Sequence, residues 1–157
     1  MQSDAVAEGI YFFGGRNEKG EVQNKLRYFK PVVIDGKIVH GEFTPLKGQG
    51  APPAARYGHT MSHLPCNNSL MICGGRNDTL CAQNMTPFLD DCVLFLLDQK
   101  VWLNVKYTVA SDRIDHMGNH CVSVITDHEQ FEKIVVFGGI TNKVGETMAD
   151  LTSSISN

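Results

Sequence analysis

The chain has 157 residues, of which 42% are hydrophobic and 20% are charged, a composition that fits one ordinary globular domain. Its 14 Lys and Arg residues against 17 Asp and Glu residues give a net charge of −3, so it lacks the basic surface that nucleic-acid binding requires. The longest apolar run near the middle, residues 93–97, is far shorter than the roughly 20 residues of a membrane-spanning helix. We therefore expect no nucleic-acid partner and no membrane partner.

Strand-like segments follow one another along the chain. They are rich in Val, Ile, Tyr and Phe, which strands favour, and turns with Gly, Pro, Asn or Asp separate them. No window of 11 or more residues has a clean 3.6-residue apolar period, which argues against amphipathic helices. The sequence predicts an all-β fold with strands near residues 10–14, 25–34, 38–44, 57–64, 69–74, 91–97, 101–107, 118–126 and 133–138.

A Gly-Gly pair closes an apolar run three times, in IYFFGG, SLMICGG and KIVVFGG. The intervals between the pairs are 60 and 64 residues, and the first two pairs both continue as GGRN. Three copies at near-constant spacing indicate a repeated unit. The pairs are Gly14 and Gly15, Gly74 and Gly75, and Gly138 and Gly139.

Other residues recur in phase with the glycines. Each interval has an aromatic residue, then a polar turn, then an Arg, a Gly and a His ahead of a strand-like run. The aromatic residues are Phe43 and Trp102, and the later residues are Arg56, Gly58 and His59 in the first interval and Arg113, Gly118 and His120 in the second.

These features resemble the kelch repeat, which runs from a glycine doublet through an Asp-rich strand with a Tyr and then a Trp to an Arg-x-Gly-His-like segment. The resemblance covers about residues 10–142. It departs from the family pattern at Phe43, where a Trp is usual, and at Phe95, which stands near the usual Tyr. The units are longer than the kelch norm of about 50 residues. We expect the extra length to form long exposed loops at residues 76–87 and 31–40.

The resemblance implies a β-propeller made of four-stranded antiparallel blades. The strands suffice for about two and a quarter blades, fewer than the roughly four to eight of a closed propeller. We therefore expect residues 1–157 to form one kelch segment of an incomplete propeller. Exposed strand edges and uncovered blade faces pair readily with other chains, so partner proteins are expected to complete or cover them.

The recurring residues are expected to have structural roles. The glycines suit a sharply turning strand with no room for a Cβ atom. Phe43 and Trp102 suit packing between blades, with a sugar-stacking platform as the alternative. His59 and His120 suit hydrogen bonding between strands. Two pairs of histidines are four residues apart, His59 with His63 and His116 with His120. On a strand, residues with this spacing lie about 13 Å apart, too far to bind one metal ion, so neither a metal site nor a cofactor is expected.

Cysteine and acidic residues complete the sequence evidence. Five cysteines with no C-x-x-C spacing predict thiols in a reducing compartment and no disulfide framework. The first residues have no basic n-region and no apolar h-region, so no secretory signal is expected. Asp90 and Asp91, adjacent on an extended chain, point to opposite faces and predict no carboxylate dyad; Asp at such a turn bonds nearby backbone amides.

The predicted function is that of a non-enzymatic scaffold or adaptor for protein–protein interaction in the cytoplasm. The kelch resemblance adds cytoskeletal and ciliary assemblies as candidate settings. The alternative is a carbohydrate-binding or oxidase-type propeller enzyme with a central pocket. Such a pocket requires polar side chains that converge on it, whereas a scaffold does not.

Overall fold

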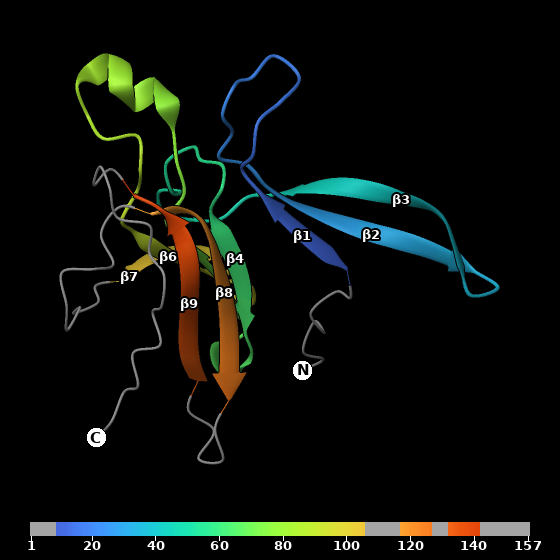
Figure 1. Cartoon of the computed structure of the whole chain (residues 1–157). Helices are drawn as coiled ribbons and strands as arrows, with labels where there is room; N and C mark the ends of the chain where they lie inside the picture. Colours follow the sequence, from blue (N-terminus) through green and yellow to red (C-terminus); the bar gives the residue numbers. More distant parts are fainter. Residues whose placement is uncertain (1–8, 106–116, 127–131, 142–157) are drawn as a thin grey trace.

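The computed structural model describes residues 9–105, 117–126 and 132–141. These residues form strands and two short 3-10 helices, so the prediction of an all-β fold is confirmed (Figure 1). Each predicted strand coincides with an observed strand to within a few residues. The elements in chain order are β1 (Ile10–Phe13), β2 (Leu26–Ile34), β3 (Lys37–Leu46), β4 (Thr60–Leu64), η1 (Pro65–Asn67), β5 (Ser69–Cys73), η2 (Asp78–Gln83), β6 (Cys92–Leu96), β7 (Val101–Val105), β8 (Gly118–Thr126) and β9 (Glu132–Ile140).

The strands form three antiparallel sheets that follow chain order. The first sheet has the order β1-β2-β3, the middle sheet β4-β5-β6-β7 and the third sheet β8-β9. The middle sheet therefore has the four strands expected of a complete unit, whereas the first and third sheets have three and two strands within the described residues.

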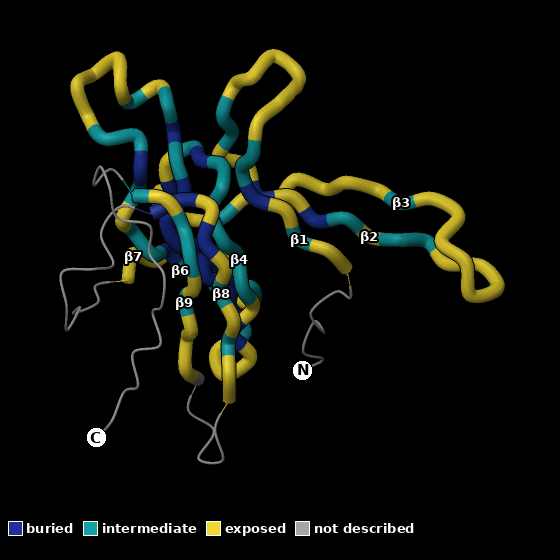
Figure 2. The backbone as a smooth tube through the Cα atoms, viewed as in Figure 1, coloured by how far each residue is buried: buried dark blue, intermediate teal, exposed yellow. Residues whose placement is uncertain are grey.

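The middle sheet is covered on both faces. Leu70 and Ile72 of β5 pack against the first sheet, and Met71 and Cys73 belong to the cluster on the opposite face, together with side chains of β8. All five residues of β5 are buried, which explains why this strand is an unbroken apolar run in the sequence. The buried positions in Figure 2 accordingly concentrate in and around the middle sheet.

β2 and β3 form a long hairpin that extends past β1 and away from the other two sheets (Figures 1 and 2). Their ladder runs out to the pair Ile34 and Lys37, and the turn residues Asp35 and Gly36 both have positive φ, as a two-residue hairpin turn requires. The expectation of a loop at residues 31–40 is therefore wrong. The β-branched residues of this segment continue the strand pairing and place the extra length in the hairpin.

The other expected loop, residues 76–87, lies outside the named strands and contains η2. It rises above the sheets next to the loop that joins β1 to β2 (Figure 1). Asn77 caps η2 by accepting a hydrogen bond from the backbone amide of Thr79. The loops that follow the first two glycine pairs thus lie at the same end of the molecule.

Within the described ranges, no helix has the length and apolar composition needed to cross a membrane.

Candidate functional site

The glycine pairs occupy backbone conformations that side chains disfavour. All six glycines have positive φ, between 58° and 109°. A Cβ atom at Gly14 would lie 2.5 Å from the carbonyl oxygen of Arg56, and one at Gly74 would lie 2.6 Å from that of Met117. At Gly138, by contrast, no atom of the described residues lies within 4 Å of such a Cβ. Gly14 and Gly74 therefore lack side chains because the next unit passes directly over them, whereas a Cβ atom at Gly15 would meet no described atom within 4 Å.

The two junctions between the sheets use the same backbone hydrogen bonds. The amide of Gly15 donates to the carbonyl of Arg56, and the amide of Gly75 donates to the carbonyl of Met117, both at 2.8 Å. Met117 therefore occupies the repeat position of Arg56. This corrects the predicted alignment of Arg56 with Arg113, which lies outside the described residues.

The predicted alignment of Gly58 with Gly118 is also wrong by one residue, because Asn119 is the residue of the third sheet that corresponds to Gly58. Gly58 has φ +61° and Asn119 has φ +56°, whereas Gly118 is not among the residues with positive φ. Asn is one of the few residues other than Gly that tolerate this conformation. The repeated segment is thus Arg-Tyr-Gly-His in the middle unit and Met-Gly-Asn-His in the third, and Gly118 stands where Tyr57 stands.

His59 and His120 lie at equivalent points of the two junctions. A Cβ atom on Gly14 would come within 3.2 Å of Cε1 of His59, and one on Gly74 within 2.9 Å of Cε1 of His120. Nε2 of His120 lies 3.0 Å from the hydroxyl of Thr60, so this histidine does link neighbouring strands. The Nδ1 atoms of both histidines are buried and have no hydrogen-bond partner among the residues that the structure describes.

Burial keeps both histidines neutral near pH 7. The pKa of His59 is lowered from 6.5 to about 4, chiefly by burial and also by the nearby Arg56 charge and His120, although a hydrogen bond with the backbone of Phe13 acts in the opposite direction. Burial also lowers the pKa of His120. A protonated imidazole at either junction would lose its hydration when the sheets pack together. Protonation of His59 or His120 therefore destabilises the contact between the sheets.

Arg56 is fully buried and links the segment before β4 to the end of β5 and the start of β6 by hydrogen bonds. Its guanidinium donates two parallel hydrogen bonds to the carboxylate of Asp91, at 2.6 and 2.7 Å. It also donates to the carbonyls of Ala54 and Gly74, at 3.0 and 2.8 Å. A buried charge requires such partners. The expectation that Asp91 would bond nearby backbone amides missed this longer-range role.

The two recurrent aromatic residues have different surroundings. Trp102 is buried at the junction of the first and middle sheets, where its ring meets that of Phe13 edge-on at 5.7 Å. Among the described rings, Phe43 contacts only those of its own sheet, with its ring 4.8 Å from that of Phe29, and it is 60% exposed. The expected packing of Phe43 between sheets is therefore not found, because within the described residues no sheet covers that face.

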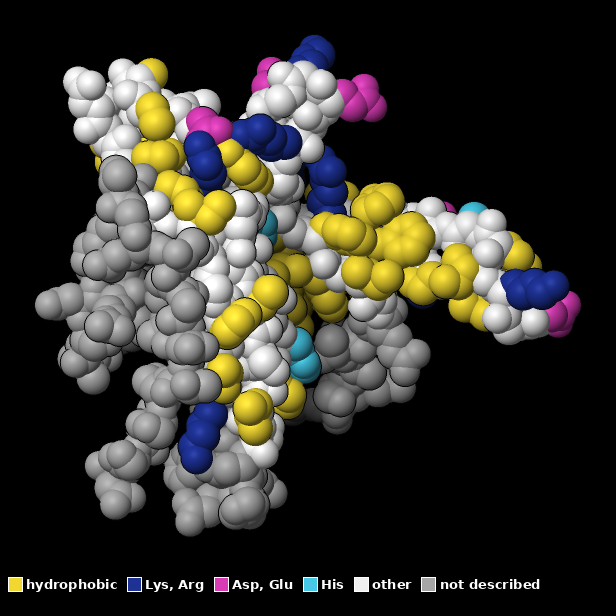
Figure 3. Space-filling model, in the orientation of Figure 1, with side chains coloured by type: hydrophobic (Ala, Val, Ile, Leu, Met, Phe, Trp, Pro, Cys, Tyr) yellow, Lys and Arg dark blue, Asp and Glu magenta, His cyan; other side chains and the backbone are white. Residues whose placement is uncertain are grey.

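A cluster of charged and aromatic side chains lies at the end of the molecule where the two loops meet (Figure 3). The carboxylate of Asp78 accepts hydrogen bonds from Tyr57 and Arg16, both at 2.6 Å, and from Arg76. The guanidinium of Arg16 lies 3.8 Å above the centre of the Tyr57 ring, and that of Arg76 lies over Phe88 at 5.2 Å. We call Arg16, Tyr57, Arg76 and Asp78 the loop cluster.

The loop cluster is partly exposed and carries one net positive charge. The side chains of Arg16 and Asp78 are 44% and 40% exposed. Hydrogen bonds from Tyr57 and Arg76 lower the pKa of Asp78, so this carboxylate stays ionised, and burial together with the bond to Asp78 raises the pKa of Tyr57. The signal for this cluster was present in the sequence, because an arginine follows each of the first two glycine pairs.

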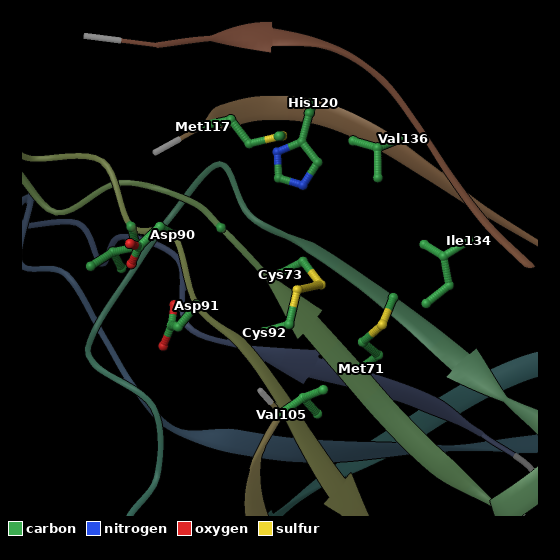
Figure 4. A pocket seen from close by; sticks show the side chains of 12 residues that line it. Met71, Cys73, Asp90, Asp91, Cys92, Val105, Met117, His120, Ile134 and Val136 are labelled. Atoms are coloured by element: carbon green, nitrogen blue, oxygen red, sulfur yellow. A yellow bond between two sulfur atoms is a disulfide. The ribbon is translucent and has the colours of Figure 1, made fainter. Parts of the chain in front are cut away.

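A cavity of about 240 Å³ lies between the middle sheet and β9 (Figure 4). Its walls are largely apolar, with Met71, Val105 and Ile134 among them, and the side chain of His120 also borders it. The third sheet has only two strands in the described residues, so it does not extend over β6 and β7. The cavity is the space that this leaves.

Cys73 and Cys92 form a disulfide in the wall of this cavity, as the joined sulfur atoms in Figure 4 show. They lie directly opposite each other on β5 and β6, with their Cα atoms 4.3 Å apart. This corrects the prediction that all five cysteines are thiols. The strand register that brings them together is not visible in their sequence spacing of 19 residues. The other three cysteines are exposed.

The described residues include no group of three or more His, Cys, Asp or Glu side chains arranged to hold a metal ion. The structure brings the first two glycine pairs, Arg56, His59, His120 and Trp102 to the sheet junctions. Phe43 and the third glycine pair lie away from any junction of described residues. No family model matches the chain, and no curated protein matches its sequence.

Proposed function

We propose that the chain is a non-enzymatic scaffold for protein–protein interaction, built from kelch-like repeats. The observation that carries this proposal is the loop cluster, in which two arginines and a tyrosine from three separate segments form one stacked, partly exposed surface. Arginine and tyrosine are enriched among the residues that contribute most to protein interfaces. The repeated junctions hold the loops on rigid sheets, which lowers the entropy lost on binding.

The chemistry of the loop cluster indicates the kind of partner that it binds. Arg16 uses one terminal nitrogen for Asp78, and Arg76 uses its Nε atom, so the described residues leave the remaining N–H groups of both guanidiniums for a partner. With one carboxylate against two guanidiniums, the cluster has an excess positive charge although the chain as a whole has a net charge of −3. A partner surface that offers Asp or Glu side chains beside an apolar or aromatic residue would complement it.

The cavity does not support the alternative of a central binding pocket. Its wall is mostly apolar, and two of its polar side chains already have partners: Asp91 binds Arg56, and His120 meets Thr60. A sugar or redox site would need convergent polar groups directed into the space. We propose the cytoplasm as the setting, with a cytoskeletal or ciliary assembly to test first, although a disulfide such as Cys73–Cys92 is rare in a reducing compartment.

The test is a comparison of the proteins that co-purify with the wild-type chain and with matched variants. Tyr57→Ala and the double variant Arg16→Ala/Arg76→Ala remove the loop cluster. Lys37→Ala also removes a cation, but at the far end of the β2–β3 hairpin. We expect the partner to bind both cluster variants at least about tenfold more weakly, as for an interface contact of more than 1 kcal/mol, and to bind the Lys37 variant normally. A partner set unaffected by either cluster variant would contradict the proposal.

A further inference from the structure

The first and middle sheets carry matching apolar faces, of which the described residues cover only one. Across β5, β6 and β7 the register aligns Leu70, Phe95 and Trp102. Across β1, β2 and β3 it aligns Ile10, Phe29 and Phe43 in the same way. The aromatic pairs also have similar geometry, with ring centres 4.6 Å apart in the middle sheet and 4.8 Å apart in the first.

Burial separates these two faces. Leu70, Phe95 and Trp102 are 1–8% exposed because the first sheet packs on them. Ile10 and Phe43 are 51% and 60% exposed, and Phe12 on the same face is 46% exposed. The first sheet in Figure 3 accordingly shows a continuous group of hydrophobic side chains. Apolar faces of this kind mark contact surfaces. We call Ile10, Phe12, Phe29 and Phe43 the leading face.

The side chains of the first sheet that cover the apolar face of the middle sheet have counterparts in the third sheet. Phe13 directly precedes the first glycine pair and lies against Trp102, and Tyr11 packs beside it. In the third sheet, Phe137 directly precedes Gly138, and Val135 stands two residues earlier, as Tyr11 does before Phe13. Phe137 and Val135 are 60% and 42% exposed, on the face of β9 opposite to the one that borders the cavity. We call them the trailing face.

We propose that the trailing face of one copy packs on the leading face of a second copy. Phe137 then packs against Phe43 of the next copy as Phe13 packs against Trp102 within the chain. The occupant is a second copy because each exposed face is one half of an interface that the chain already forms internally between its first two sheets. This inference rests on the proposed scaffold function and assigns its first partner.

The contact is head-to-tail, because two different surfaces meet. Each added copy therefore exposes a new leading or trailing face, and assembly continues unless a ring closes. The chain would then provide a row of loop clusters, one per copy, and increase the strength of binding to a multivalent partner.

The experiment measures the mass of the full chain by sedimentation and light scattering over a range of concentrations. We expect the wild type to form species of two or more times its 17.3 kDa as concentration rises. Phe43→Asp removes the leading face and Phe137→Asp removes the trailing face, and each variant alone should remain at 17.3 kDa. Met85→Asp, at a residue with a similar 55% exposure outside both faces, is the matched control and should associate like the wild type.

Mixing the two face variants gives the decisive result. Phe43→Asp keeps a trailing face and Phe137→Asp keeps a leading face, so the mixture should form a one-to-one pair of twice 17.3 kDa and grow no further. Circular dichroism should show that both variants keep the β-sheet spectrum, because the two phenylalanines are exposed in the single chain.

Other outcomes overturn the inference. A wild type that stays at 17.3 kDa at every concentration has no such contact. Association that survives Phe137→Asp but not Phe43→Asp would indicate a symmetric contact through leading faces only. Neither outcome affects the proposed scaffold function, which fails only if the loop-cluster variants keep the partners of the wild type.

Discussion

Trp102 and Phe43 hold the same position in two sheets of one chain, and only one of them is buried. Trp102 is 8% exposed, because Phe13 and its neighbours cover it, whereas Phe43 is 60% exposed. The local sequence pattern is similar in both units, and the register of the strands is the same. The difference shows that the neighbouring sheet, not the strand pattern, decides which aromatic residue contributes to stability.

The largest expected effect is the loss of Trp102. We expect Trp102→Ala to lower the free energy of unfolding by about 3 to 5 kcal/mol, because it leaves a cavity at the junction of the first two sheets. In dilute, unassociated chain, Phe43→Ala should change it by roughly 0.5 kcal/mol or less, as for exposed surface sites. Urea unfolding at low protein concentration, monitored by circular dichroism, measures both values. Equal losses under these conditions would mean that Phe43 is buried within the single chain and that the contrast between the two sheets is absent.

The glycine pairs extend the comparison to the third sheet. Gly74→Ala should cost about 1 to 2 kcal/mol for the left-handed backbone and a further 1 to 3 kcal/mol for the clash with the Met117 carbonyl. Gly138 has a similar φ, but a Cβ atom there would meet no described atom within 4 Å. Gly138→Ala should therefore cost only the strain of the left-handed backbone, about 1 to 2 kcal/mol. If the two variants unfold at the same urea concentration, another segment covers Gly138 as Met117 covers Gly74.

The disulfide between β5 and β6 gives the next effect. Thiol titration of the unfolded chain without reductant should find three reactive cysteines of the five, and five after reduction. Closing a loop of this length stabilises a fold by about 3 kcal/mol in the chain-entropy model, so reduction should lower the unfolding midpoint. Cys121→Ser, at an exposed cysteine outside the disulfide, is the control and should leave the reductant dependence unchanged. Five reactive thiols before reduction would restore the sequence-based prediction.

Acid should weaken both junctions. The pKa of His59 is 6.5 in an unfolded chain but about 4 in the fold, so the folded state binds fewer protons between these values. The stability that neutral His59 contributes is therefore completely present above pH 6.5. The free energy of unfolding falls as the pH drops toward 4, by up to about 3 kcal/mol at about 1.4 kcal/mol per pKa unit. The lowered pKa of His120 acts in the same direction.

The range between pH 7 and pH 5 isolates the histidines, because most carboxylates titrate below it. Urea midpoints should fall over this range in the wild type and fall less in His59→Gln, which cannot take up the proton. A wild-type midpoint that is constant from pH 7 to pH 5 would contradict the burial of these rings.

The strands and the repeat were predictable, since alternating β-branched and aromatic residues and three glycine pairs are local features. The partner of Arg56 was not, because Asp91 lies 35 residues away and is brought to it by the middle sheet. The alignment of Gly58 with Gly118 failed because Asn119 adopts the same left-handed conformation. The disulfide and the exposure of Phe43 depend on strand register and on a neighbouring sheet, neither of which a local pattern contains.

The smallest effect is expected at the loop cluster. Asp78→Asn and Asp91→Asn make the same chemical change, but Asp91 neutralises a buried guanidinium whereas Asp78 is bound by partly exposed ones. Asp91→Asn should lower the free energy of unfolding by about 1.5 to 3 kcal/mol, as for hydrogen bonds to a charged group. Asp78→Asn should lower it by less than about 1 kcal/mol, because exposed ion pairs are screened by water. Urea unfolding of both variants at pH 7 tests the contrast, since a larger loss for Asp78→Asn would make the loop cluster a structural element and remove the argument that it is a binding surface.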